Sequence, residues 1–392
     1  MRTRALALIL VCACGKRPVE APTVAPAPAP APAAVDAAAP VDPNAPIDVS
    51  ADLEKLRGQA GLPALAAIVI DGERTVAQGV AGVRRIGHDA NAELGDAFHL
   101  GSDTKAFTAF VAARLVDAGV VTWDTKLVDV WPALKKRMHA DLRNVTLAQL
   151  LQHRAGLAPD PKDRKLLLQP ADRPLVEQRR VIVEAVLADK PIHAPGKQFA
   201  YSNTGYIVAG ALLEAKTGKS WEELVREHVL DPLALASCGF GPTATPDADG
   251  GVWAHGGESP SYVALAIDNP PAFGPAGTMH CALPDWATFA RAQLLRDPKL
   301  LRDETWTVLH TALPLPDRGG GYAMGWLTAE LPWAKGVVLT HDGSNTVNYA
   351  SAMLLVDQRI AVLVATNAGD AAAQRTVVTS VVGLAQRFGS AR

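Results

Sequence analysis

The amino-acid sequence predicts an α/β fold in which one antiparallel sheet is assembled from both ends of the folded part, with helices packed on it. Two strand-like apolar pairs support this prediction, one in residues 62–82 (LPALAAIVIDGERTVAQGVAG) and one in residues 348–369 (NYASAMLLVDQRIAVLVATNAG). The segments between them have mainly helical patterns. A parallel sheet would instead show regular alternation of strands and helices. We therefore expect the strands of the two chain ends to meet in one sheet, beside a mostly helical second lobe.

Local signals place the elements at the two ends. Residues 49–60 have the pattern of a short amphipathic helix. The first strand pair is joined at Asp71-Gly72, a dipeptide favoured in two-residue hairpin turns. The second pair turns around Asp357, and a final helix is predicted over about residues 371–388.

Size and charge restrict the class of protein. The chain has 392 residues, of which 48% are hydrophobic and 20% charged, which is typical of a globular protein with a large core. The formal net charge is −2, and no run of Lys and Arg occurs beyond the extreme N-terminus. These features do not fit a nucleic-acid-binding protein. We expect a small-molecule or peptide substrate as the partner instead.

The first residues, MRTRALALILVCACGKRP, resemble an export signal. Two arginines precede an apolar run over residues 5–13, which is too short to span a bilayer. The run ends in V-C-A-C-G, which resembles a bacterial lipobox and implies cleavage before Cys14 and lipid attachment to its sulfur. Cys12 fits less well because Val11 precedes it. An ordinary signal peptide with two incidental cysteines is the alternative.

A Pro/Ala-rich segment follows, most clearly over residues 18–47 (PVEAPTVAPAPAPAPAAVDAAAPVDPNAPI). Such a composition cannot form a core and favours an extended tether. The predicted organisation is a signal peptide over residues 1–13, a lipid-anchored linker over residues 14–47 and one folded domain over residues 48–392. The lipid would be the only membrane contact of an exported protein that faces the periplasm or the cell exterior.

A serine and a lysine stand three residues apart in G-S-D-T-K, as Ser102 and Lys105. Apolar residues then recur at helical spacing, and Gly119 stands where a C-terminal cap belongs. The common explanation of such a pair is a helix-capping serine beside a solvated lysine. The alternative is a nucleophile beside its own base, one helical turn away, at a helix N-terminus that favours negative charge.

Two further motifs decide between these readings. Tyr201-Ser202-Asn203 opens an apolar helix, and His341-Asp342-Gly343 precedes the penultimate strand. With Ser102-Asp103-Thr104-Lys105, they reproduce the order S-x-x-K, Y-x-N and H-x-G. The sequence from about residue 50 to 388 therefore resembles the serine β-lactamase and penicillin-binding-protein superfamily, on the side of the class C β-lactamases, D-Ala-D-Ala carboxypeptidases and family VIII-type esterases. The resemblance implies a β-lactamase/transpeptidase-like fold.

The resemblance also implies roles. Ser102 would be the nucleophile, and either Lys105 or Tyr201 would be the base in acylation. A lysine can act as a base only if its pKa falls well below the usual value of about 10.4. Asn203 would hold Lys105 and the substrate amide. The remaining implied residues bind substrate: His341 occupies the third motif, Gly343 allows close approach of the strand, and Ser344 supplies an oxyanion-hole N–H together with Ser102.

His341 departs from true β-lactamases, which carry a lysine at this position. Histidine is cationic only part of the time near neutral pH, so it would hold an anionic substrate less firmly. Asp342 would oppose such a substrate if it faced the site. The sequence therefore favours a serine hydrolase with D,D-peptidase/carboxypeptidase-like or esterase-like scope, needing no metal or organic cofactor. A weak β-lactamase and an inactive lipid-tethered ligand- or partner-binding protein are the alternatives.

Other features have structural explanations. Lys216-Thr217-Gly218 spells a β-lactamase third motif but stands at a helix end, where Gly218 is a C-terminal cap. Cys238 and Cys281 either pair or stay free, because the sequence does not show their separation. Four scattered histidines lack metal-ligand spacing and are expected to be structural: His99, His153, His255 and His280.

Overall fold

A computed structural model describes residues 42, 44–246, 250–315 and 319–389. The chain divides after Pro43, and the second of its two units is Asn44–Arg392. All helices and strands of the described residues lie in this second unit. The predicted signal peptide, Cys14 and most of the predicted linker lie outside the described residues.

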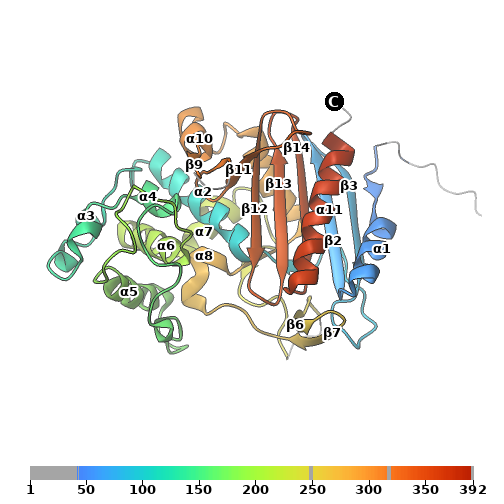
Figure 1. Ribbon diagram of the computed structural model, residues 1–392, viewed down its shortest axis with the longest axis horizontal. Helices are drawn as coiled ribbons and strands as arrows, with labels where there is room; N and C mark the ends of the chain where they lie inside the picture. The colour runs from blue at the N-terminus through green and yellow to red at the C-terminus, as the bar shows by residue number, and fades with distance from the viewer. Residues whose placement is uncertain (1–41, 43, 247–249, 316–318, 390–392) are drawn as a thin grey trace, which may run out of the picture. The chain divides into compact units, whose positions relative to one another are not determined.

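One large sheet dominates the folded unit (Figure 1). Its strands lie in the order β1-β3-β2-β14-β13-β12-β11-β10-β9, so that strands from both ends of the chain are neighbours. All neighbouring strands are antiparallel except the short β1, which pairs with β3 in parallel. The strand bounds are β1 Ile47–Asp48, β2 Ala64–Asp71, β3 Arg74–Gly82, β9 Leu313–Pro314, β10 Gly321–Tyr322, β11 Leu327–Glu330, β12 Val337–Ser344, β13 Tyr349–Leu355 and β14 Ile360–Thr366. The prediction of an α/β fold with a sheet built from both chain ends is confirmed.

Helices cover both faces of this sheet. On one face, α1 (Ser50–Ala60) and α11 (Ala371–Gly389) pack on β3, β13 and β14, as Figure 1 shows. On the other face, α9 (Leu283–Leu295) packs on β2 and β14. Alternate residues of β2 point to the two layers, since Leu65 and Val69 join one apolar cluster while Ile68 joins the other. The central strands are therefore buried on both sides, which explains their near-continuous apolar sequences.

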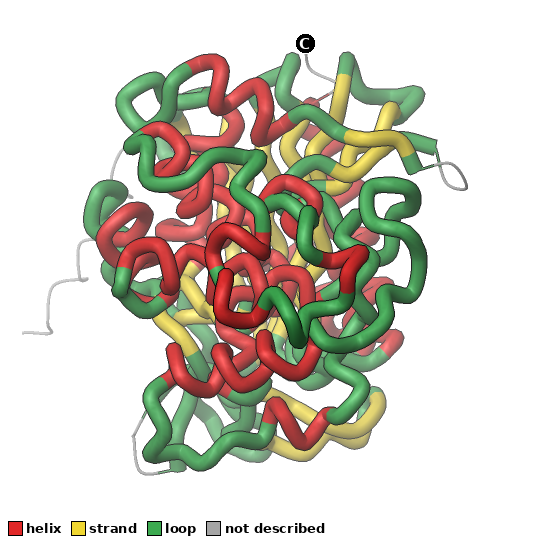
Figure 2. Tube along the Cα trace, turned by 90° about the vertical axis from the view of Figure 1, so that its left-hand side faces the viewer, coloured by secondary structure: helices red, strands yellow, loops and turns green. Residues whose placement is uncertain are grey.

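The helical lobe lies beside the sheet, and Figure 2 shows its helices and loops in front of the strands. It is the predicted helical second lobe. The helix α2 runs through its core, with Phe107 stacked on Phe289 of α9 at 3.8 Å between ring centroids. The helix bounds are α2 Thr104–Asp117, α3 Leu127–Val130, α4 Leu147–Leu151, α5 Leu175–Val186, α6 Asn203–Thr217, α7 Trp221–Val225, α8 Gly274–Gly277 and α10 Asp303–His310.

Two small sheets complete the unit. In the first, β8 (Met279–Ala282) lies between β4 (Ala97–His99) and β5 (Gly239–Phe240). In the second, β6 (Ala254–Glu258) pairs with β7 (Ser261–Leu265). Cys238 and Cys281 form a disulfide that joins the start of β5 to β8, which answers the question that the sequence left open.

The first hairpin differs from its prediction by one residue. Asp71 pairs with Arg74, so the two loop residues are Gly72 and Glu73 rather than Asp71 and Gly72. Gly72 has φ of +58°, a conformation that glycine adopts at little cost, and it therefore takes the first loop position. The other end elements confirm their predictions, since α1, the turn around Asp357 and α11 lie where expected.

The helix that follows Ser102 ends as predicted. Its last helical residue is Asp117, and Gly119 adopts φ of +71° just beyond it. The helix α6 ends in the same way, with Gly218 at φ of +73° and its N–H donated to the Glu214 carbonyl. Lys216-Thr217-Gly218 is therefore a helix end, as the sequence indicated.

None of the helices in the described residues is both long and apolar enough to cross a bilayer.

Candidate active site

Ser102 lies in a tight turn between β4 and α2. Residues Gly101–Asp103 form one turn of 3-10 helix, and Gly101 has φ of +52°. A Cβ at Gly101 would lie 2.3 Å from the backbone nitrogen of Ser344, so only glycine fits there. The α2 helix has no side-chain cap, and the Ser102 hydroxyl accepts a hydrogen bond from Lys105 instead. The explanation of Ser102 as a capping residue is therefore wrong.

Lys105 is fully buried beneath Ser102. Its Nζ donates to Ser102 Oγ over 3.0 Å, to Asn203 Oδ1 over 2.9 Å and to the Ala276 carbonyl over 2.7 Å. Burial lowers the pKa of Lys105 to about 7, against the opposing effect of the Asp103 and Asp160 carboxylates. A substantial fraction of this amine is thus neutral near pH 7, and a neutral amine can accept a proton.

Tyr201 and Asn203 approach Lys105 from the start of α6. The Tyr201 ring centroid lies 4.8 Å from Lys105 Nζ. Burial raises the pKa of Tyr201, although its hydrogen bond with Ser102 acts in the opposite direction. Asn203 is the first residue of α6, and its Nδ2 donates to Asp160 Oδ1 over 3.0 Å. The amide orientation of Asn203 is thereby fixed, with Oδ1 turned to the amine.

The C-terminal half of β12 packs directly on the Ser102 turn. β11 pairs with β12 only as far as Thr340, so residues 341–344 have β13 on one side and the turn on the other. A Cβ at Gly343 would lie 1.9 Å from the Leu100 carbonyl oxygen and 2.8 Å from the Ser102 nitrogen. Gly343 is therefore required for this approach of two backbones. Ser344 follows it and is exposed.

His341 points into the interior rather than to solvent. Only 3% of His341 is exposed. The Nε2 atom of its ring lies 3.4 Å from the Tyr322 hydroxyl, and the Nδ1 atom lies 2.9 Å from the Asp342 carbonyl. Burial and the nearby Lys105 lower the pKa of His341 to about 3. The expectation of a partly cationic His341 is therefore wrong, because the ring stays neutral at physiological pH.

Asp342 lies on the opposite face of β12 from His341. Desolvation of its carboxylate raises the pKa of Asp342, although hydrogen bonds with Ser351 and Tyr349 act in the opposite direction. Alternation along a strand explains the separation, since neighbouring side chains point to opposite faces. Asp342 and Ser344 therefore share the exposed face of β12, and the effect of the Asp342 charge on a substrate stays a prediction.

Several neighbours of the site lie outside the three motifs. The Ala276 carbonyl that holds Lys105 comes from α8, and Asp160 comes from the loop after α4. The His153 ring packs on Tyr201 at 4.3 Å between centroids, and its Nδ1 accepts the Ser202 N–H over 3.0 Å. His153 thus supports the wall of the site, a role compatible with its expected structural class. A backbone carbonyl carries no sequence signal, so Ala276 could not be predicted.

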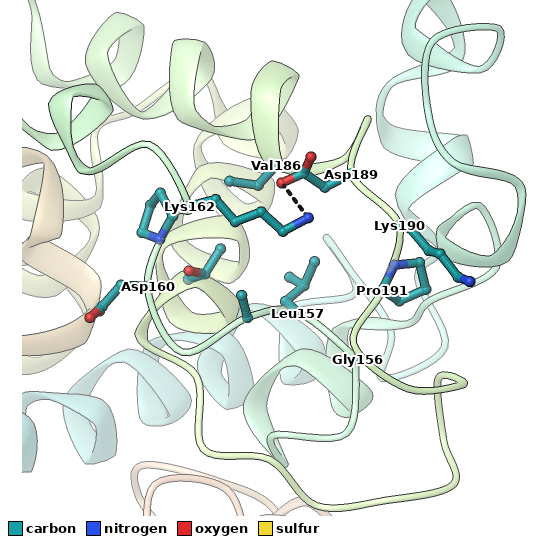
Figure 3. Close-up of a pocket in the computed structure, with 11 residues that line it drawn as sticks. Gly156, Leu157, Asp160, Lys162, Val186, Asp189, Lys190 and Pro191 are labelled. Atoms are coloured by element: carbon teal, nitrogen blue, oxygen red, sulfur yellow. Dashed lines mark ion pairs between the residues drawn. The ribbon is translucent and has the colours of Figure 1, made fainter.

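A small cavity lies beside the site (Figure 3). It has a volume of about 10 Å³, room for about one water molecule, and an ion pair joins Lys162 to Asp189 in its wall at 3.4 Å. Figure 3 shows the Asp160 carboxylate at the margin, pointing away from this ion pair. The cavity is too small for an organic substrate. Asp160 therefore belongs with Asn203 and Lys105 rather than with a separate binding pocket.

Possible metal ligands do not gather anywhere in the part of the chain that the structure describes. No group of three or more His, Cys, Asp or Glu side chains there could hold a metal ion.

Comparison with known proteins identifies the family. The Beta-lactamase family model matches residues 49–386, which is most of the chain. The chain belongs to the Beta-lactamase family. This family, with its penicillin-binding-protein and amidohydrolase neighbours, generally comprises serine hydrolases that act on amide bonds.

Two curated relatives each match part of the chain. Penicillin-binding protein 4 of Amycolatopsis lactamdurans is 30% identical over 183 residues, which is 46% of this chain and 46% of the relative. Unguisins hydrolase ungD' of Aspergillus campestris is 28% identical over 297 residues, 72% of this chain and 54% of the relative. The Beta-lactamase-family chain thus spans about half the length of the curated relatives that it matches.

Solved structures share the fold. The octameric penicillin-binding protein homologue from Pyrococcus abyssi superposes with a TM-score of 0.72 at 20% identity, over 86% of this chain and 76% of that chain. A D-stereospecific amidohydrolase from Streptomyces sp. gives a TM-score of 0.67 at 25% identity, over 84% and 96% of the two chains. The prediction of a β-lactamase/transpeptidase-like fold is confirmed.

Proposed function

We propose that this protein hydrolyses an amide or ester bond through an acyl-enzyme on Ser102. The observation that supports the proposal most directly is the 3.0 Å contact between Lys105 Nζ and Ser102 Oγ. A serine hydroxyl needs an adjacent base to become nucleophilic, and a base with a pKa near the working pH serves best. The pKa of Lys105, at about 7, meets that condition.

Lys105 is the better candidate for the acylation base. The raised pKa of Tyr201 keeps its phenol protonated, so it is suited to donate a proton rather than to accept one. In the proposed reaction, Lys105 takes the Oγ proton as Oγ bonds to the substrate carbonyl carbon. The bond from carbon to the leaving nitrogen or oxygen then breaks, and the leaving group takes the proton by way of Tyr201. Water releases the acyl group in the second half-reaction.

Two backbone N–H groups would stabilise the oxyanion of the tetrahedral intermediate. Ser102 and Ser344 are candidates because Gly101 and Gly343 bring their backbones together. Each such donor is worth about a hundredfold or more in rate. Asn203 would contribute by holding both Lys105 and the substrate amide.

The substrate class follows from the third motif. His341 is buried and neutral, so it offers no positive charge to a substrate carboxylate. This supports uncharged esters and amides over β-lactams and over peptides held by a free carboxylate. The D-stereospecific amidohydrolase among the structural neighbours makes D-amino-acid amides a specific candidate class.

Covalent labelling tests the proposal. The purified protein is treated with a fluorophosphonate probe and, separately, with fluorescent penicillin, and the adduct is located by mass spectrometry. We expect the fluorophosphonate on Ser102, none in Ser102→Ala, and normal labelling in Ser220→Ala, which alters only the cap of α7. Penicillin labelling as well would favour the D,D-peptidase-like scope. Absence of both adducts would contradict an enzyme and favour an inactive ligand-binding protein.

We also propose that the protein is an exported lipoprotein anchored through Cys14. The support comes from the sequence of residues 11–15, V-C-A-C-G, and from the Pro/Ala-rich segment behind it. A lipid on Cys14 would hold the hydrolase at the cell envelope, where the tether would let it reach substrates away from the membrane surface.

A further inference from the structure

A buried carboxylate, Asp268, lies next to the site but outside its motifs. It stands in the loop between β7 and the short helical turn Pro271–Phe273, and its side chain is 3% exposed. A buried carboxylate is costly unless polar partners surround it. The partners of Asp268 connect it to both sides of the Ser102 turn.

The first partner is His99, at the end of β4. The Nε2 of His99 lies 2.7 Å from Asp268 Oδ1, and both side chains are buried. The other ring nitrogen, Nδ1, accepts the Gly101 N–H over 3.0 Å. Because Nδ1 accepts, the ring proton is on Nε2, which lies close to Asp268 Oδ1 but has no hydrogen-bond partner among the described residues. The His99 ring therefore lies between Asp268 and Gly101, the residue before Ser102, and contacts both.

The second partner is Asn345, the residue after Ser344. Its Nδ2 donates to the same oxygen, Asp268 Oδ1, over 3.0 Å. Its Oδ1 accepts from Val347 N and Asn348 Nδ2, so the amide is fixed at both ends. Asn345 is 7% exposed. The end of β12 is therefore held by the oxygen that also holds the Ser102 turn.

Asn269 extends this arrangement to Lys105. Its backbone N–H donates to Asp268 Oδ1 over 2.6 Å, and its Nδ2 donates to the Gly277 carbonyl over 2.7 Å. Gly277 follows Ala276, whose carbonyl accepts from Lys105. One carboxylate oxygen thus receives contacts from three groups, each of which reaches a different backbone segment around Ser102.

We propose that Asp268 is a positioning residue that fixes the two N–H groups of the oxyanion hole, through His99 on the Ser102 side and Asn345 on the Ser344 side. The inference rests on the proposed acyl-enzyme function and deepens it. Asp268 does not touch the reacting atoms. Removing the Asp268 carboxylate would displace the two oxyanion-hole N–H groups. These donors stabilise the negative charge that develops on the substrate oxygen in the transition state, so the substitution would lower kcat more than it would change KM.

The identity of the contacting oxygen suggests a rescue experiment. All three contacts converge on Oδ1, while Oδ2 has no hydrogen-bond partner among the described residues. Asparagine presents the same Oδ1, whereas alanine presents no acceptor. Asp268→Asn should therefore retain the arrangement, and Asp268→Ala should abolish it.

The test uses the full-length protein with p-nitrophenyl acetate, and the concentration of active sites is set by fluorophosphonate titration. We expect Asp268→Ala to lower kcat about 10- to 100-fold with KM within about threefold of wild type. Asp268→Asn should recover kcat to within about threefold. The inhibition constant of phenylboronic acid, which forms a tetrahedral adduct with serine, should rise in Asp268→Ala by the factor by which kcat/KM falls.

Two further variants keep the test decisive. Asp117→Ala is the matched control, since Asp117 accepts from Arg302 and Thr305 at the far end of α2 and should affect stability alone. Asn345→Ala removes one donor to Asp268 and should lower kcat even if Asp268→Ala fails to fold. Unchanged kcat in folded Asp268→Ala, or in Asn345→Ala, would overturn the inference while the function stands. A wild-type protein without reactive Ser102 would overturn both.

Discussion

Lys105 Nζ lies 3.0 Å from Ser102 Oγ and only 2.7 Å from the Ala276 carbonyl oxygen, so the amine is held from two directions. A fully buried amine requires such acceptors, because each unpaired polar N–H in the interior costs free energy. The third acceptor, on Asn203, comes from another part of the chain. The packing of α2, α6 and α8 therefore sets the position of the proposed base, and the burial of the amine in that packing lowers its pKa.

The first prediction concerns the pH dependence of acylation. The pKa of Lys105 is lowered to about 7, so the amine is protonated below pH 7 and neutral above it. We expect the second-order rate constant of Ser102 labelling by the fluorophosphonate to rise about tenfold per pH unit below pH 7 and to level off above about pH 8. The measurement is stopped-flow or gel-based labelling between pH 5 and 9. A midpoint near pH 10 would contradict a lowered pKa of Lys105.

A second prediction isolates the proton acceptor itself. Lys105→Arg keeps a positive charge and hydrogen-bond donors, but arginine does not lose its proton in proteins. We expect kcat/KM for p-nitrophenyl acetate to fall by about a thousandfold or more. The matched control is Lys216→Arg at the end of α6, where the side chain has no part in the proposed reaction. Retained activity in Lys105→Arg would assign the base to another group, with Tyr201 as the first candidate.

The third prediction concerns Gly343. A Cβ there would lie 1.9 Å from the Leu100 carbonyl oxygen, so Gly343→Ala must push β12 away from the Ser102 turn. We expect at least a hundredfold loss of kcat/KM and a lower melting temperature. Gly383→Ala is the control, because Gly383 lies within α11 and has open space at its Cβ position. It should leave activity unchanged and raise stability by about 1 kcal/mol. Activity equal to wild type in Gly343→Ala would show that the close approach is dispensable.

Features governed by neighbours in sequence were predictable. The turn of β13 into β14, the two helix ends at Gly119 and Gly218, and the Ser102–Lys105 proximity all depend on local periodicity or turn chemistry. The predicted position of the first hairpin turn was wrong by one residue. The turn dipeptide alone does not set the strand register, because side-chain pairing and a bulge between Val69 and Ile70 also set it.

Features that depend on distant segments were not predictable. The neutrality of His341 follows from its burial, with Tyr322 against its ring, which no local pattern around H-D-G reveals. The contact of Asp268 with His99 joins residues that lie far apart in sequence and belong to no motif. Ala276 acts through a backbone carbonyl, which every residue possesses. The site motifs therefore indicate the reacting groups, while the fold supplies the residues that hold them.

A fourth prediction concerns stability in acid. Burial lowers the pKa of His310 to about 3, whereas an unfolded chain leaves it near 6.5. The unfolded state therefore binds one more proton than the folded state between these values, and the free energy of unfolding must fall as pH drops from about 6.5 towards 3. At pH 4 this group alone accounts for up to about 3 kcal/mol. We expect urea denaturation of His310→Gln to lose less stability between pH 7 and 4 than the wild type does. Equal losses in the two proteins would contradict the lowered pKa of His310.

The last prediction concerns the cell envelope. If Cys14 carries a lipid, Cys14→Ser removes the attachment atom but leaves the apolar run of residues 5–13 and the Pro/Ala-rich tether unchanged. A single acyl chain gives only marginal membrane binding, whereas a multiply acylated cysteine anchors stably, so the loss should be nearly complete. We expect the wild type in the membrane fraction and Cys14→Ser in the soluble or secreted fraction, with equal fluorophosphonate labelling of Ser102 in both. Cys12→Ser is the matched control and should stay with the membrane. Membrane partitioning of Cys14→Ser equal to that of the wild type would rule out anchoring through this residue.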